Sequence, residues 1–229
     1  MPVLYHHPLD AGSRYVRLVL AEYGEEVEMR EVPPLARSEE ILALNPAGTV
    51  PVFCDDNAAV VSPSPVIGEY LAETRGVRFG EDSLIAATAT ERAETRRLVS
   101  WFGDKMHAEV TRPLVEELLL KRIAPNVRGG SPDSVAIRAG RSNIRYHLQY
   151  IGYLVERRDW LCGNQMSLAD LAAAAEISCL DYAGEVPWEG NEAARTWYAR
   201  VKSRLSFRPI LADLVKGAPP ARHYADLDF

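Results

Sequence analysis

The chain has 229 residues, of which 47% are apolar, enough for one large domain or two small ones with well-packed cores. Its net charge of −6 leaves no broad basic surface, so nucleic acid and anionic membranes are poor partners on electrostatic grounds. The three cysteines lack metal-ligand spacing, and no apolar run is long enough to cross a bilayer. We therefore expect a cytosolic protein with no metal site, no nucleic-acid partner and no membrane insertion.

Residues 1–76 alternate between strand and helix patterns. The order β-α-β-α-β-β-α is that of a thioredoxin-like domain with a mixed four-stranded sheet. Ser13, Ser38 and Ser64 each precede or open an apolar helical pattern, so we expect each of them to act as an N-cap. The strands are predicted at 2–6, 27–32, 52–54 and 59–61, and the helices at 13–23, 38–44 and 64–74.

The remainder of the chain is predicted to be helical. A glycine-containing and charged linker covers 77–84, a helical domain covers 85–216, and an extended C-terminal tail covers 217–229. The predicted class is thus α/β followed by all-α. Within the helical domain we expect one long helix over 86–121, bent at Pro113, and further helices at 135–158, 168–180, 193–205 and 210–215.

Ser167 and Asp170 form a capping box at the start of a nearly all-apolar helix. The Ser167 hydroxyl can accept a hydrogen bond from the amide three residues on, and Asp170 can accept one from the Ser167 amide. A buried amide without a partner costs about 1 to 3 kcal/mol. We therefore interpret this pair as a structural cap and not as part of a binding site.

Residues 45–53 read NPAGTVPVF, an extended turn that leads into a strand. The Val50–Pro51 bond is a candidate for the cis form, which would turn the Val50 peptide outward to pair with an extended peptide ligand. Together with Ser64 at the next helix start, this segment resembles the signature of the glutathione S-transferase superfamily. The resemblance implies the glutathione transferase fold, a homodimer and a glutathione pocket that includes Val50, Pro51 and Ser64.

Two positions depart from what this resemblance implies. Asp10 lies where relatives carry a hydroxyl or thiol that activates glutathione, and Pro63 lies where they carry an acid beside Ser64. A hydrogen bond to a thiolate contributes about 1.5 to 3 kcal/mol. An ionised Asp some 4 Å away opposes it by up to about 4 kcal/mol at an effective dielectric of about 20. We predict weak or absent glutathione binding, and no cofactor, with Ser13 as the substitute catalytic hydroxyl if the protein is an enzyme.

The last seven residues, HYADLDF, are similar to the ending of bacterial cell-division proteins with this fold that bind the tubulin-like polymer FtsZ. The resemblance implies a non-enzymatic protein at the midcell division site that links FtsZ to septal cell-wall synthesis. It makes Asp226, Leu227, Asp228 and Phe229 candidate contact residues. Composition alone favours a frayed terminus or one tucked against the helical domain. A cytosolic transferase that conjugates glutathione to electrophiles remains the alternative.

Overall fold

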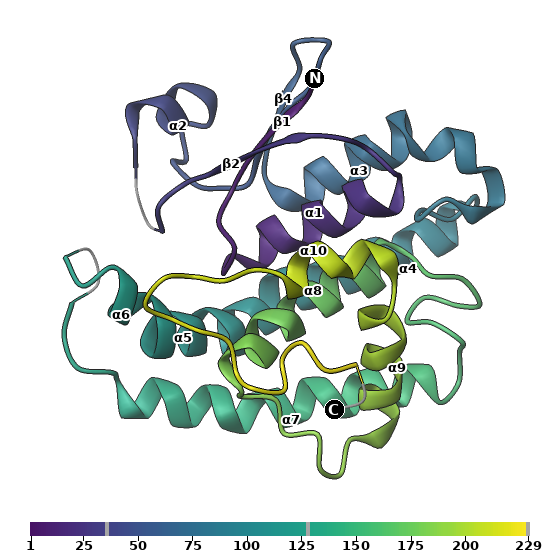
Figure 1. Ribbon diagram of the computed structural model, residues 1–229. Coiled ribbons are helices and arrows are strands. Elements are labelled where there is room, and N and C mark those ends of the chain that lie inside the picture. The colour runs from purple at the N-terminus through teal and green to yellow at the C-terminus, as the bar shows by residue number, and fades with distance from the viewer. Residues whose placement is uncertain (35–36, 127–128, 228–229) are drawn as a thin grey trace.

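The computed structural model describes residues 1–34, 37–126 and 129–227 (Figure 1). The N-terminal domain is built on the predicted mixed four-stranded sheet, and its strand order is β2-β1-β3-β4. Strand β1 pairs parallel to β2 and antiparallel to β3, and β3 pairs antiparallel to β4. The elements of this domain are β1 (Val3–His6), α1 (Ala11–Glu22), β2 (Glu28–Glu31), α2 (Glu39–Leu44), β3 (Val52–Cys54), β4 (Val60–Val61) and α3 (Ser64–Thr74).

Alternate residues of β1 serve two different cores, as the period of a strand requires. Leu4 joins Phe53 and the buried sides of α1 and α3 in the main core. Its neighbour Tyr5 faces the opposite side, where it packs with Ile41 of α2 in a small separate cluster. The sheet is therefore covered by α1 and α3 on the side of the helical domain and by α2 on the other side (Figure 1).

The helical domain begins with a single helical segment that runs from Ala89 to Ile123. It was predicted as one long helix bent at Pro113, and its departure from α geometry is spread over two π-helical stretches. The wider π turn before Pro113 accommodates a residue that has no amide hydrogen. The segment consists of α4 (Ala89–Ser100), η2 (Trp101–Thr111), α5 (Arg112–Val115), η3 (Glu116–Leu120) and α6 (Lys121–Ile123).

The other helices agree with the predicted ones in order and differ at their ends. The segment predicted as a linker is largely a 3₁₀ helix, and the last predicted helix, 210–215, is a single turn at Arg208–Leu211 with Pro209 at its start, a position that proline favours. Among the described residues, no helix is both long and apolar enough to span a bilayer. These elements are η1 (Gly76–Asp82), α7 (Ser134–Val155), α8 (Leu168–Ala183), α9 (Glu192–Lys202), η4 (Leu205–Phe207) and α10 (Arg208–Leu211).

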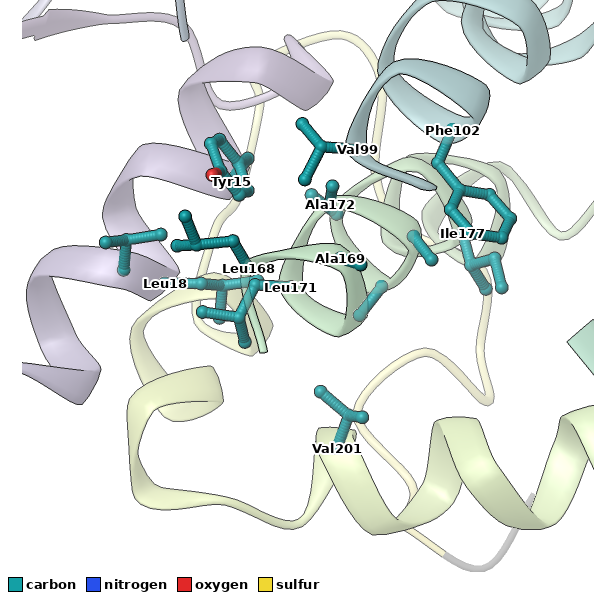
Figure 2. Packing of buried hydrophobic residues seen from close by; sticks show 14 of the residues in the cluster. Tyr15, Leu18, Val99, Phe102, Leu168, Ala169, Leu171, Ala172, Ile177 and Val201 are labelled. Atoms are coloured by element: carbon teal, nitrogen blue, oxygen red, sulfur yellow. The ribbon is translucent and has the colours of Figure 1, made fainter. Parts of the chain in front are cut away.

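Helix α8 lies at the centre of the molecule and is buried from Leu168 to Tyr182, as its sequence predicts. The predicted capping box is present, with the Asp170 carboxylate 2.9 Å from the Ser167 amide nitrogen. Figure 2 shows α1 of the N-terminal domain contributing Tyr15 and Leu18 to the cluster that contains Leu171 of α8. The two domains therefore share one hydrophobic core.

Candidate functional site

Three segments of the N-terminal domain meet at one small cavity of about 120 Å³. Its lining includes five of the six residues predicted for a glutathione-like pocket: Asp10, Val50, Pro51, Pro63 and Ser64. The segments approach closely, since a Cβ atom added to Gly12 would lie 2.9 Å from the Ser64 Oγ. Glycine therefore lets α1 pass close to the start of α3, and a larger residue would force the Ser64 side chain to shift.

The Val50–Pro51 peptide bond is cis, which confirms the sequence prediction. The Ser62–Pro63 bond is also cis, and this second bond was not predicted. The turn formed by 45–51 is held from within, because Asn45 Nδ2 donates a hydrogen bond to the Thr49 carbonyl at 2.9 Å. The backbone at Val50 thus reaches the cavity in a defined conformation.

Asp10 is the N-cap of α1. Its Oδ2 accepts a hydrogen bond from the Ser13 amide at 2.6 Å, and the helix begins at Ala11. The expectation that Ser13 caps this helix is wrong, because the helix begins at Ala11 and the Asp10 carboxylate accepts from the amide of its third residue, Ser13. Burial raises the pKa of Asp10, and the hydrogen bonds from Ser13 oppose that rise.

Ser13 lies inside the first turn and is fully buried. Its Oγ accepts a hydrogen bond from the His7 amide at 3.2 Å, and the residue does not line the small cavity. The hydroxyl that was predicted to substitute for a catalytic group is thus engaged with the backbone of the loop between β1 and α1.

Pro63, and not Ser64, is the N-cap of α3, and it contributes no side-chain hydrogen bond to the helix start. Ser64 is the first helical residue, so its predicted capping role is wrong. The helix begins at Ser64, and Pro65 lies in its first turn. At this end of the cavity the lining residues are Pro63, Ser64 and Pro65, which carry no acid for a ligand ammonium group.

Five residues of the helical domain complete the lining of the cavity, and two of them, His107 and Glu176, can carry a charge; sequence reasoning missed both. His107 of η2 and Glu176 of α8 line it together with Asp10, and His107 Nδ1 lies 3.2 Å from Glu176 Oε2. Burial lowers the pKa of His107, but the charge and hydrogen bond of Glu176, together with the Asp10 charge, outweigh it and raise that pKa to about 8. An imidazolium therefore stands between two carboxyl groups at neutral pH.

A larger cavity of about 490 Å³ adjoins the small one and shares Asp10, Val50 and His107 with it. Its volume is in the range of small-molecule sites. Ser13 does not line this cavity either. The walls are mainly apolar, with Leu9, Val32, Pro33, Pro34, Val115 and Leu120, and Thr111 and Arg112 add polar groups.

The electrostatic balance of the site is unfavourable for a thiolate. In the small cavity one imidazolium faces the two carboxyl groups of Asp10 and Glu176, whereas Arg37 and Arg112 line the adjoining larger cavity. A glutathione thiolate at the start of α1 would be a further anion beside Asp10. Among the residues that the structure describes, no group of three or more His, Cys, Asp or Glu could hold a metal ion.

The C-terminal tail is exposed only in part. Tyr224 is 1% exposed, whereas Asp226 is exposed and Leu227 retains 43% of its surface. Two of the four candidate contact residues are therefore accessible. The other two, Asp228 and Phe229, lie outside the described residues.

Comparison with known proteins places these features in a family. A family model for the N-terminal domain of glutathione S-transferase matches residues 13–74. FtsZ-localized protein A of Caulobacter vibrioides is 45% identical, and the match covers 99% of this chain and 97% of that protein.

Solved structures agree with the sequence match. FzlA from C. crescentus superposes with a TM-score of 0.92 at 44% identity, covering 100% of this chain and 99% of that chain. A glutathione S-transferase from Sinorhizobium meliloti superposes with a TM-score of 0.95 at 50% identity, over 100% of both chains. The chain belongs to the glutathione S-transferase superfamily, as its turn at Val50–Pro51 predicts.

Proposed function

We propose that this protein is a cell-division regulator that binds FtsZ filaments and has little or no glutathione transferase activity. The observation that carries the proposal is the 45% identity to FtsZ-localized protein A over almost the whole length of both chains. In this proposal the protein acts as a cytoplasmic homodimer at midcell in bacteria and links FtsZ to septal cell-wall synthesis. The exposed end of the C-terminal tail supplies part of the contact.

The geometry of the cavity supports the non-enzymatic half of the proposal. The N-cap of α1 is a carboxylate, Asp10, whose oxygen already accepts from the Ser13 amide. At the other end, Pro63 supplies neither an anion nor an amide donor. Both changes remove contacts that a bound glutathione would need, while the fold around them is intact.

Co-sedimentation of the full-length protein with FtsZ polymers tests the proposal. We expect wild type to sediment with polymers, and Asp226→Lys to sediment several-fold less, because it reverses an exposed charge. Asp56→Lys is the matched control, since Asp56 is also exposed and lies in the turn between β3 and β4, at the opposite end of the molecule from the tail (Figure 1). Absence of wild-type sedimentation contradicts FtsZ binding, and equal sedimentation of both variants contradicts the role of Asp226.

A glutathione transferase remains the second candidate, because the two cavities are open and His107 brings a positive charge to Asp10. Calorimetric titration with glutathione and turnover of an aryl halide distinguish the two functions. On our proposal wild type shows neither. Asp10→Ser keeps a good N-cap and removes the carboxylate, so it should gain about tenfold or more in glutathione affinity. Tight binding and rapid conjugation by wild type would favour the enzyme.

A further inference from the structure

The C-terminal tail is docked on the protein over much of its described length. Ala218 is fully buried, and its carbonyl accepts a hydrogen bond from the Tyr182 hydroxyl at 2.7 Å. Three residues later, the Ala221 amide donates to the Tyr182 carbonyl at 2.8 Å. One residue of the central helix α8 thus holds the tail at two points, and Figure 1 shows the yellow segment crossing the helical domain.

The Tyr224 side chain is buried at the end of this docked stretch. Its hydroxyl accepts a hydrogen bond from Arg14 Nη1 at 3.0 Å and donates one to the Ile210 carbonyl at 3.0 Å. Its ring packs edge-on against the Tyr182 ring, with the ring centroids 5.0 Å apart. The Arg14 guanidinium and the Lys202 ammonium each lie 5.7 Å from the centre of the Tyr224 ring, close enough for cation–π attraction.

Residues of both domains surround the Tyr224 side chain. Arg14 comes from α1 and is fully buried, where it also donates to the Pro8 carbonyl at 2.6 Å. Lys202 comes from α9 and forms a buried ion pair with Asp181 of α8 at 2.9 Å. His223 of the tail reaches the same carboxylate, with 3.3 Å between His223 Nε2 and Asp181 Oδ1. Withdrawal of the Tyr224 side chain would leave an open space beside the two buried cations, Arg14 and Lys202.

We propose that Tyr224 is a positioning residue that fixes where the exposed end of the tail meets its protein partner. The proposal rests on the proposed function and adds that the tail acts as a preorganised element. Asp226 lies two residues beyond the anchor, so the chain lets it move by no more than about 7 Å from that point. The end of the tail carries acidic and apolar side chains, so it suits a partner surface with a basic group beside an apolar pocket. Because this end is already held in position, binding avoids much of the entropy cost of ordering a free peptide.

Limited proteolysis tests the anchor without FtsZ. Arg222 is exposed, so trypsin releases the last seven residues when the tail opens. Tyr224→Phe removes both hydrogen bonds of the hydroxyl and keeps the ring, and we expect cleavage after Arg222 to be about tenfold faster or more. Tyr146→Phe is the control, since Tyr146 is 53% exposed on α7. Equal cleavage rates in the two variants would overturn the anchor.

Co-sedimentation with FtsZ then tests positioning. A Gly-Ser-Gly insertion between Ala225 and Asp226 leaves Tyr224 and the fold in place but frees the end of the tail. We expect the insertion variant to bind polymers at least several-fold more weakly than wild type, while its cleavage after Arg222 stays at the wild-type rate. Full binding by the insertion variant would overturn positioning and leave FtsZ binding intact. Absence of binding by wild type would instead remove the proposed function, and the positioning claim with it.

Discussion

The Asp170 carboxylate accepts hydrogen bonds from three parts of the chain. Its Oδ2 accepts from the Ser167 amide at 2.9 Å, and its Oδ1 accepts from the Leu161 amide at 3.0 Å and from Trp197 Nε1 at 2.9 Å. Burial raises the pKa of Asp170, and these donors oppose that rise. The side chain therefore caps α8 and also holds the preceding loop and α9 against it.

Asp170→Ala should lower stability strongly, because it removes the acceptor of four buried donors: the Ser167 amide and hydroxyl, the Leu161 amide and Trp197 Nε1. At about 1 to 3 kcal/mol for each donor, with partial relaxation, we expect a loss of about 3 to 5 kcal/mol. For a chain of this size that lowers the melting temperature by about 6 to 15 °C, measured by calorimetry.

Asp133→Ala provides the comparison, since Asp133 caps α7 at an exposed helix start. It should cost only about 1 kcal/mol. FtsZ co-sedimentation at low temperature should be unchanged in both variants. If the Asp170→Ala variant has the same melting temperature as wild type, the structural role of Asp170 is contradicted.

At the scale of elements, local sequence patterns predicted most of the fold, but they could not predict contacts between elements that lie far apart in the sequence. The capping box at Ser167 depends on residues three positions apart, so the sequence contains the whole motif. The pairing of His107 with Glu176 joins positions 69 residues apart on η2 and α8, and no local pattern connects them. The cap of α1 was assigned to Ser13 because serine is a frequent N-cap, but Asp10 is another residue type that caps well, and the backbone geometry decides for Asp10.

The η2 helix places His107 where its charge affects stability. The pKa of His107 is raised from 6.5 to about 8 in the folded protein. Its protonated form therefore contributes stability that is fully present below about pH 6.5 and is lost as the pH rises through about 8. Because the side chain is partly open to solvent, we expect a contribution of about 1 kcal/mol.

The measurement is the free energy of unfolding by urea for wild type and His107→Gln, at several pH values from about 6 to 9. Wild type should lose about 1 kcal/mol relative to the variant across this range. Burial lowers the pKa of His6 and of His7 to about 4, so both are neutral in the folded protein over this range and cancel in the difference. A constant difference between the two proteins, or one that grows with pH, contradicts the assignment.

At the scale of the whole molecule, α1 binds the two domains together through charged side chains as well as through the shared core. Arg17 makes two hydrogen bonds to the Asp213 carboxylate, at 2.7 and 2.8 Å. Glu22, at the other end of α1, accepts two from Arg204, at 2.6 and 2.8 Å. Buried Arg14 donates to Ser178 of α8 at 3.0 Å. The N-terminal domain therefore meets the helical domain through paired groups along the whole of α1.

This arrangement predicts that the protein unfolds as one cooperative unit although its fold has two domains. Separation of the domains would expose the α1 face that packs on Leu171 and leave Arg14 without its buried partners, so neither domain has a complete core alone. In scanning calorimetry we expect a single transition whose calorimetric and van't Hoff enthalpies agree within error. Arg17→Met should shift that transition to lower temperature without splitting it, because the core still couples the domains. Two resolved transitions in wild type, or a fragment of residues 1–76 that folds alone, would show instead that the domains are independent.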